Sequence, residues 1–451
     1  MAAMVSQNIL QQALALHQKG DTAAAEPLYR AVLAAQPAHG EAAHNLGRLL
    51  AEKGDHAEAL AQFQTALKSE PGVAQHWLSY ADALLLTGHP REAQLVLTRG
   101  RQRGLAGPQA DILLQRAQAA ISPADLQFER ATAHAMRGEI QDAIAGYRQV
   151  IVLAPDHAEA HFRLGSLLSE SGQIAEGFAH YMRRAALEHG GRPQAAGKPL
   201  PAHRIKHDRE QAEYLGARPG LAAGLFHLED GTRLSGPAIN TANVTPELVR
   251  QWQDSHPKMV VIDNFLTPEA LEKLRNYCAG STIWRRNYDA GYIGATPEDG
   301  LACPLMAQIA EEIRAAFPQI IGDHAFRYLG AFKYDSTLST GTNTHADNSL
   351  VNVNLYIAPD AANLDPESGG MDIWDIAAPA GEEMRRYNGD EALARDFLKQ
   401  RGARMTRVPH RANRAILFKS DLFHKTSDCR FREGYLNKRI NVSLLFGHRP
   451  G

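Results

Sequence analysis

The sequence predicts a multidomain fold: an all-α solenoid of helical repeats, followed by a jelly roll of antiparallel strands with flanking helices. Three observations support this prediction. Glycine followed by a polar residue recurs every 34 residues in the first part of the chain, and short alternating segments separated by turn residues dominate the last part. The chain also has 451 residues, 44% of them hydrophobic, which is sufficient for two or three packed domains.

The period of 34 residues defines the first domain, which we expect to span residues 6–188. The glycine pairs lie at Gly20-Asp21, Gly54-Asp55, Gly88-His89, Gly138-Glu139 and Gly172-Gln173. This is the period of tetratricopeptide repeats, each of which contains two packed helices. Small residues recur where the paired helices would meet, for example Gly47 and Ala59 in the second repeat. The pattern predicts about five repeats.

The repeat array is interrupted near residues 104–123. The interval between Gly88 and Gly138 is 50 residues instead of 34, so we expect the solenoid to bend or split there. Stacked repeats present a concave groove that binds extended peptides or helices. The repeats therefore predict a protein or peptide partner.

Residues 189–253 lack the repeat period and are predicted to form a connector rich in glycine, proline and charge. Near its end, Thr245 before Pro246 predicts a helix start, because threonine caps helices and proline is favoured at their first position. The last domain, residues 254–451, opens with a predicted strand at 258–266. A helix capped by Thr267 follows.

Short alternating segments then predict the strands of the jelly roll. They lie at 325–335, 350–358, 370–374, 404–409, 415–418 and 439–447. Between residues 360 and 404 the chain is longer than a compact barrel needs, and 382–400 has helical spacing and many charges. This insert is either a lid over a substrate site or a solvated decorating helix.

Three residues of the last domain form a candidate metal site. His345 and Asp347 are separated by two positions before an apolar strand, so their side chains point to the same side of an extended chain. His424 follows another apolar strand. Two histidines and one carboxylate form the facial triad of non-haem Fe(II) oxygenases, which leaves coordination positions open. We therefore predict that these residues bind iron and carry catalysis.

Arg439 is a candidate anchor for a co-substrate. It begins a segment in which polar Arg439, Asn441 and Ser443 alternate with apolar residues, so the three polar side chains share one face. A guanidinium inside a barrel needs a partner and pairs well with a carboxylate. We interpret Arg439 as the anchor for the distal carboxylate of 2-oxoglutarate, with Asn441 and Ser443 beside it. The alternative is an edge strand with Arg439 in water.

From residue 259 onward, the chain resembles the Fe(II)/2-oxoglutarate-dependent dioxygenases, and within them the prolyl 4-hydroxylase-like branch. The matching features are VVIDNFLTPEALEKLRNYC at 260–278, Tyr334 before His345, the Gly369-Gly370 pair before MDIW, and RAILFKSDLFH ending at His424. The resemblance implies a double-stranded β-helix that uses O2 as a further co-substrate. It also implies iron ligation by His345, Asp347 and His424, and contacts to 2-oxoglutarate from Tyr334 and Arg439.

The chain also departs from that branch. Prolyl 4-hydroxylases commonly use lysine as the anchor, so Arg439 points to the wider superfamily and leaves open whether proline is the target. Asn354, Trp374 and Arg411 are candidate substrate-binding residues, although Trp374 also fits packing inside the barrel. Asp347 argues for hydroxylation, because related halogenases lack the carboxylate.

Charge and composition limit the partners and the compartment that we expect for this protein. The net charge of −2 gives no reason to expect nucleic acid or an anionic membrane as a partner. Three scattered cysteines, Cys278, Cys303 and Cys429, indicate neither a disulfide framework nor a zinc site. The N-terminus resembles no secretory leader, and no segment is long enough to span a membrane. We expect a cytoplasmic protein of open oligomeric state.

Three functions are compatible with the sequence. The first is a hydroxylase whose repeats recruit a protein or peptide substrate. The second is an oxygenase of a small molecule, such as an amino acid or a natural-product intermediate, with the repeats used for assembly. The third is a scaffold with an inactive barrel, which the complete set of candidate ligands argues against.

Overall fold

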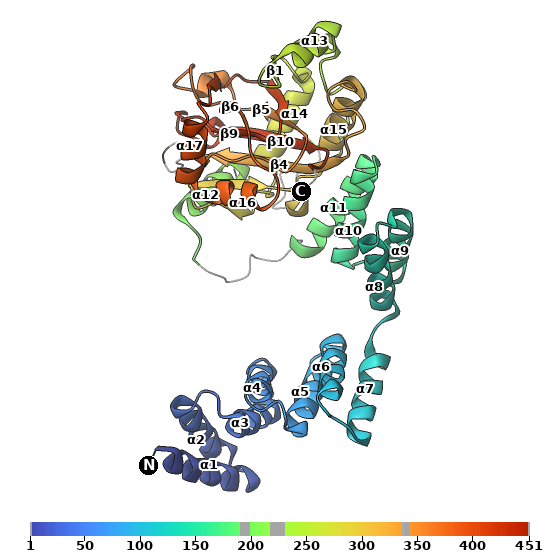
Figure 1. Ribbon diagram of the computed structural model, residues 1–451, viewed down its shortest axis with the longest axis vertical. Coiled ribbons are helices and arrows are strands. Elements are labelled where there is room, and N and C mark those ends of the chain that lie inside the picture. The colour runs from blue at the N-terminus through green and yellow to red at the C-terminus, as the bar shows by residue number, and fades with distance from the viewer. Residues whose placement is uncertain (1, 190–198, 217–230, 336, 338–341, 450–451) are drawn as a thin grey trace. The chain divides into compact units, whose positions relative to one another are not determined.

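The computed structural model describes residues 2–189, 199–216, 231–335, 337 and 342–449, so parts of the predicted connector lie outside the described residues. The chain forms two compact units, Met1–Leu126 and Gln127–Gly451. Figure 1 shows helices throughout the first unit, and helices followed by strands in the second. Within the described residues, no helix is long and apolar enough to cross a membrane.

The first unit consists of helices that pack in consecutive pairs. They are α1 (Ala2–Gln18), α2 (Thr22–Ala35), α3 (Gly40–Glu52), α4 (His56–Ser69), α5 (Ala74–Leu86) and α6 (Pro90–Gln102). The segment that interrupts the repeat period contains one more helix, α7 (Pro108–Ala120), which packs against α5 and α6. The extra residues therefore add a helix at the end of this block.

The residues of the 34-residue pattern explain the helix pairs. Gly54 adopts a positive φ of 83° in the turn between α3 and α4, and the Asp55 carboxylate caps α4 by accepting a hydrogen bond from the amide of Glu58 at 3.2 Å. A Cβ atom at Gly47 would lie 3.0 Å from the ring of Phe63. The small residue thus allows the two helices to approach closely.

Two more helix pairs follow, the first of which begins four residues before the second unit, and then the helices of the connector. The repeat helices are α8 (Pro123–Met136), α9 (Ile140–Leu153), α10 (Ala158–Glu170) and α11 (Ile174–His189). The connector contains α12 (Ala202–Gly216), the 3-10 turn η1 (Thr241–Asn243) and α13 (Pro246–Asp254). As the sequence predicts, the Thr245 hydroxyl caps α13, accepting a hydrogen bond from the amide of Leu248 at 3.2 Å.

Two antiparallel sheets follow. The larger has the strand order β1-β8-β5-β10-β4-β3-β2, and the smaller has the order β7-β6-β9. The strands are β1 (Met259–Ile262), β2 (Arg286–Asn287), β3 (Tyr292–Ala295), β4 (Phe326–Tyr334), β5 (Val351–Tyr356), β6 (Met371–Ala377), β7 (Met405–Val408), β8 (Arg414–Lys419), β9 (Leu422–Thr426) and β10 (Arg439–Phe446). Between them lie α14 (Pro268–Gly280), η2 (Pro297–Asp299), α15 (Pro304–Ala316), η3 (Asp360–Ala362), α16 (Glu382–Gly389), α17 (Glu391–Gln400) and η4 (Tyr435–Asn437).

The predicted helix at 382–400 is divided into α16 and α17. Asp390 has an extended backbone, with φ −139° and ψ 100°, and its carboxylate accepts a hydrogen bond from the amide of Leu393 at 3.0 Å. Aspartate is a strong N-cap, and Gly389 before it weakens a continuing helix. A second helix therefore starts at Glu391.

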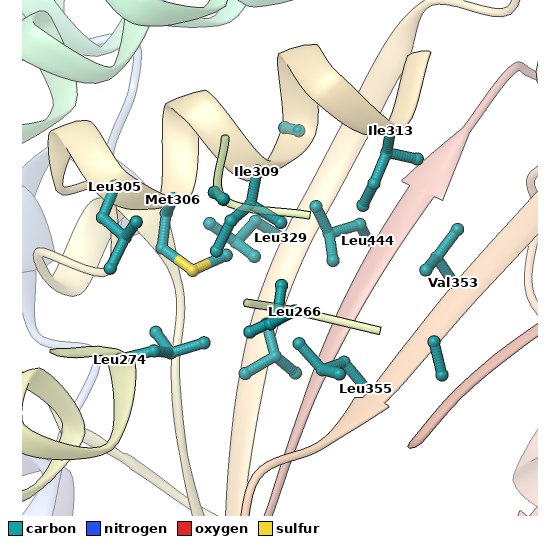
Figure 2. Close-up of a cluster of buried hydrophobic side chains, with 14 of the residues drawn as sticks. Leu266, Leu274, Leu305, Met306, Ile309, Ile313, Leu329, Val353, Leu355 and Leu444 are labelled. Atoms are coloured by element: carbon teal, nitrogen blue, oxygen red, sulfur yellow. The ribbon is translucent and has the colours of Figure 1, made fainter. Parts of the chain in front are cut away.

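The core of the second unit lies between the large sheet and helices α14 and α15. Figure 2 shows Leu305, Met306, Ile309 and Ile313 of α15 close to side chains of the strands, among them Leu329 and Leu444. On β10, residues 442, 444 and 446 join this core, so period-two alternation directs Arg439, Asn441 and Ser443 to the opposite face. That face carries the candidate site.

Candidate functional site

Backbone hydrogen bonds bring the three candidate metal ligands together. The amide of His345 donates to the carbonyl of His424 at 3.0 Å, and the amide of His424 donates to the carbonyl of His345 at 2.8 Å. The amide of Asp347 donates to the carbonyl of Ser420 at 2.9 Å. As a result, one ligand atom from each of His345, Asp347 and His424 lies within 4.8 Å of the other two.

Hydrogen bonds also orient these side chains. His345 Nδ1 donates to the carbonyl of Asn343 at 2.7 Å, and His424 Nδ1 donates to the carbonyl of Leu422 at 2.9 Å. Because a carbonyl only accepts, each neutral ring keeps its lone pair on Nε2, as a metal-binding histidine requires. The Asn352 amide donates to Asp347 Oδ2 at 2.8 Å.

Electrostatics favours an uncharged imidazole at His424. Burial and, to a smaller extent, the neighbouring His345 together lower its pKa to about 4. His424 Nε2 lies 3.5 Å from Asp347 Oδ2. Two neutral imidazoles and one carboxylate fit a divalent metal that accepts nitrogen and oxygen ligands.

A cavity of about 610 Å³ adjoins the three ligands. Its lining side chains fall into a polar group and an aromatic group. The polar group includes Thr342, Asn343, Asn352, Asn354, Asn388, Thr426, Asn441 and Ser443. The aromatic group consists of Tyr288, Tyr292, Tyr328, Phe332 and Tyr334. The cavity therefore offers hydrogen-bonding groups and broad ring faces beside a possible metal.

Arg439 is fully buried next to this cavity. Its Nε donates to the carbonyl of Gly369 at 2.6 Å, its Nη2 to the carbonyl of Gly370 at 3.1 Å, and its Nη1 to Asn441 Oδ1 at 2.7 Å. Its guanidinium carbon lies 4.7 Å from the centre of the Tyr334 ring. In the described chain, no Asp or Glu forms an ion pair with it.

That arrangement fits an anionic ligand. A buried charge is costly unless an opposite charge accompanies it, and the three hydrogen bonds of Arg439 use three of its five N–H groups. Asn354 lines the same cavity, and its Nδ2 donates to Ser443 Oγ at 2.8 Å, while its buried Oδ1 has no hydrogen-bond partner in the described chain. A ligand with a carboxylate would suit the guanidinium.

Tyr334 also lies at the cavity, but its closest polar partner is not Arg439. Its hydroxyl lies 3.2 Å from Thr426 Oγ1, and burial raises its pKa. The phenol therefore remains protonated at neutral pH and can donate a hydrogen bond.

Two candidate substrate residues lie elsewhere. Trp374 is on β6, where it packs against a cluster that includes Leu398 and Phe423. Arg411 is exposed, and its Nη1 donates to Asp263 at 2.7 Å. Neither Trp374 nor Arg411 is among the residues that line the cavity.

Asn388 and Tyr288 are cavity residues that we did not single out from the sequence. Asn388 lies in the insert, and no local pattern connects it with His345. For Asn352 a signal existed: it precedes Asn354 by two positions on one strand, so period-two alternation places both side chains on the same face.

The comparisons with known proteins identify the repeats. A tetratricopeptide repeat family model matches residues 10–69, 44–95 and 128–196, so the repeats that the 34-residue period predicts are present. No curated protein matches the chain.

Solved structures give distant similarities. MamA 41-end from Desulfovibrio magneticus RS-1 has 19% identity, with 43% of this chain and 98% of that chain covered and a TM-score of 0.24. YrrB, a TPR protein with an unusual peptide-binding site, has 15% identity, coverage of 41% and 86%, and a TM-score of 0.20. SnoK, a non-heme alpha ketoglutarate dependent carbocyclase from nogalamycin biosynthesis, has 17% identity, coverage of 48% and 90%, and a TM-score of 0.36.

Proposed function

We propose that this chain is an Fe(II)/2-oxoglutarate-dependent dioxygenase that hydroxylates a protein or peptide substrate recruited by its tetratricopeptide repeats. One observation carries the proposal: a fully buried guanidinium without an acidic partner in the described chain lies beside a cavity that also contains two histidines and one carboxylate. A metal and a dicarboxylate co-substrate would satisfy both features.

His345, Asp347 and His424 would hold the metal through three ligand atoms and leave its other positions open. Bound Fe(II), 2-oxoglutarate and O2 supply the oxidising chemistry, in which the co-substrate becomes succinate and CO2 while a C–H bond of the substrate becomes C–OH. The carbonyls of Asn343 and Leu422 keep the Nε2 lone pairs of the two histidines available.

Arg439 would bind the distal carboxylate of 2-oxoglutarate with N–H groups that it does not use in its hydrogen bonds to Gly369, Gly370 and Asn441. Gly369, Gly370 and Asn441 hold the guanidinium in one orientation, so little side-chain entropy remains to be lost on binding. The Tyr334 hydroxyl can donate a further hydrogen bond. Complete burial of Arg439 excludes water and strengthens the attraction.

A second candidate function is the oxygenation of a small molecule. A cavity of about 610 Å³ lies in the range typical of small-molecule sites. In that case the repeats would serve assembly. In either case the fold we propose for residues 254–451 is a double-stranded β-helix.

The test of the proposed chemistry is succinate release by the full-length chain supplied with Fe(II), 2-oxoglutarate and O2. We expect His424→Ala and Asp347→Ala to remove most of this turnover. His410→Ala is the matched control, because His410 is also buried, but its Nε2 donates to the carbonyl of Ala358 at 3.2 Å and it lies outside the metal cluster. Full activity in His424→Ala would contradict the proposed ligand set.

The anchor is tested separately. Arg439→Ala should raise the 2-oxoglutarate concentration needed for half-maximal turnover by about 30-fold or more, because the loss of one partner of a buried charge pair costs about 2–5 kcal/mol. Iron binding, measured in the absence of O2, should change little. An unchanged 2-oxoglutarate requirement would place the anchor elsewhere. A search for products that gain one oxygen atom, among proteins and metabolites, would separate the two candidate functions.

A further inference from the structure

Five aromatic side chains line the cavity, and we call them the aromatic shelf: Tyr288, Tyr292, Tyr328, Phe332 and Tyr334. The rings of Tyr288 and Tyr292 are stacked with centroids 4.4 Å apart, and those of Tyr292 and Tyr334 with centroids 4.8 Å apart. The ring of Phe332 lies edge-on to Tyr288 at 6.0 Å. The shelf leads from the β2–β3 hairpin to the buried Tyr334.

Two glycines make room for the shelf. A Cβ atom at Gly330 would lie 2.6 Å from the hydroxyl of Tyr328, and a Cβ atom at Gly294 would lie 3.0 Å from the ring of Tyr288. Larger residues at either position would push these rings away from the sheet. The two glycines therefore leave the space that the rings of Tyr328 and Tyr288 occupy.

Asp289 adds a negative charge beside the shelf, whereas the nearby Arg286 is already paired with Glu298 and Asp299. Asp289 lies in the hairpin turn, is exposed and borders the cavity, and among the described lining residues there is no lysine or arginine. Under the proposed function, the charges of the metal and Arg439 would offset those of Asp347 and the two carboxylates of 2-oxoglutarate. The carboxylate of Asp289 would then give the cavity its remaining charge.

We propose that the substrate, under the proposed function, presents a cationic side chain to the aromatic shelf, with an ammonium or guanidinium group close to Asp289. Tyrosine rings attract cations through their electron-rich faces, and the attraction increases as water is excluded. A carboxylate at the rim adds attraction and favours approach of a positive group. Tyr288 and Asp289 are thus residues that determine specificity.

The test uses acetyl-arginine amide and acetyl-lysine amide, each compared with an uncharged analogue of similar size, acetyl-citrulline amide and acetyl-norleucine amide. Binding is measured on the full-length chain loaded with Mn(II) and 2-oxoglutarate in the absence of O2. We expect the cationic member of at least one pair to bind about threefold to tenfold more tightly. Asp289→Asn and Tyr288→Leu should reduce that preference.

Asp254→Asn is the matched control, because Asp254 is equally exposed but lies at the end of α13, next to the edge strand β1 at the other side of the large sheet. Equal binding of charged and uncharged probes, no binding of any probe, or an unchanged preference in Asp289→Asn would overturn the assignment of the shelf. Failure of the chain to bind 2-oxoglutarate with metal would instead overturn the proposed function.

The insert between residues 360 and 404 contacts the segment that carries two of the proposed metal ligands. Asn388 of α16 forms two hydrogen bonds with the backbone of Ala346, the residue between His345 and Asp347. The amide of Ala346 donates to Asn388 Oδ1 at 2.9 Å, and Asn388 Nδ2 donates to the carbonyl of Ala346 at 2.8 Å. The side chain thus holds the segment as a neighbouring strand would.

Glu391, the first residue of α17, adds a second attachment. Its carboxylate accepts hydrogen bonds from the amide of Thr344 and from Thr344 Oγ1, the latter at 3.0 Å. Ala346 and Thr344 are both buried, so their backbone groups depend on these bonds. Residues 344 and 346 alternate with the two ligands, and both are held by the insert.

We infer that Asn388 and Glu391 are positioning residues for the proposed metal ligands. Through Ala346 and Thr344, they would fix the backbone that carries His345 and Asp347. The test is the affinity of the full-length chain for Mn(II), measured by calorimetry without O2. Because partners that orient metal ligands typically contribute 10–100-fold to affinity, we expect Asn388→Ala to weaken Mn(II) binding by about tenfold or more. Asn388→Asp, which keeps the acceptor and loses the donor, should be intermediate.

Asp390→Ala is the matched control, because Asp390 caps α17 through the amide of Leu393 and does not contact residues 344–346. It should lower thermal stability without a comparable loss of Mn(II) affinity. If Asn388→Ala binds Mn(II) as tightly as the unmodified chain, or no more weakly than Asp390→Ala, the positioning role is wrong. If the unmodified chain itself does not bind Mn(II), the proposed function fails as well.

Discussion

Two repeats of this chain share one sequence pattern but have different packing partners. In the first unit, α3 and α4 meet where Gly47 faces Phe63; in the second, α10 and α11 meet where Gly165 faces Tyr181. The hydrophobic cluster around Phe63 contains residues of repeat helices alone. In contrast, Ile174, Phe178 and Tyr181 of α11 belong to the cluster that forms the core of the sheet region.

Polar contacts reinforce this difference. Glu311 of α15 accepts a hydrogen bond from the amide of Ala175 at 3.1 Å, and Arg184 Nη1 donates to the carbonyl of Glu298 in η2 at 3.2 Å. The Glu298 carboxylate in turn accepts from Arg286, which begins the hairpin that carries Tyr288. The last repeat thus supports a wall of the candidate site, whereas the period alone describes only its internal helix pair.

Truncation of the chain at two positions should have the largest effect on folding. Deletion of residues 1–126 should leave a folded second unit, since its core is complete without them. Deletion of residues 1–189 should cause unfolding or aggregation, because it removes three apolar side chains of α11 from that core and exposes the surface they cover. Soluble yield and thermal unfolding followed by circular dichroism measure both. A cooperative, stable product of the longer deletion would contradict the difference between the repeats.

A single substitution tests the packing of α11 against the sheet region. Phe178→Ala should lower the free energy of unfolding of the second unit by about 3–5 kcal/mol, the typical loss for a buried phenylalanine; its ring is 1% exposed and lies 5.6 Å from that of Phe326 in β4. Phe63→Ala, also in a buried repeat position, should affect the first unit alone. Denaturation with limited proteolysis assigns each loss to a unit, and a loss confined to the first unit for Phe178→Ala would refute the docking of α11.

Local patterns of the sequence predict the parts of the fold that depend on neighbouring residues. The glycine period predicts the helix pairs, and alternation from Arg439 to Phe446 predicts which side chains face the candidate site. The docking of Phe178 depends on a strand more than a hundred residues away in sequence, so the period carries no information on it. For the same reason the partner of Arg411, Asp263, and the contact of Asn388 with Ala346 were not predicted.

Acid should affect both units in the same way. Burial lowers the pKa of His44 in α3 and of His180 in α11 to about 4, with a further contribution from a neighbouring histidine in each case. The unfolded pKa is about 6.5, so the unfolded chain binds more protons below that pH, and the stabilisation present above pH 6.5 is lost as the pH falls toward 4.

Unfolding midpoints between pH 7 and 4 measure this loss. His44→Asn should flatten the profile of the first unit and His180→Asn that of the second; profiles that stay unchanged would show that other groups dominate.

The smallest expected effect concerns the ion pair between Glu170 of α10 and Arg327 of β4, whose charged atoms lie 2.7 Å apart. Both side chains are about one-third exposed, at 33% and 36%, and pairs of this kind contribute about 0–1 kcal/mol. The pair between Arg30 and Glu58 in the first unit has similar exposure, at 44% and 33%, and serves as the reference. Double-mutant cycles with alanine should give coupling energies below about 1 kcal/mol for both pairs, decreasing with added salt.

If the Glu170–Arg327 coupling exceeded that of the reference pair by about 2 kcal/mol, charge would contribute as much to the docking of the last repeat as its apolar face. Similar small values would leave the apolar face as the main source of the difference between the two repeats, because residues of α11 join the core of the sheet region and those of α4 do not.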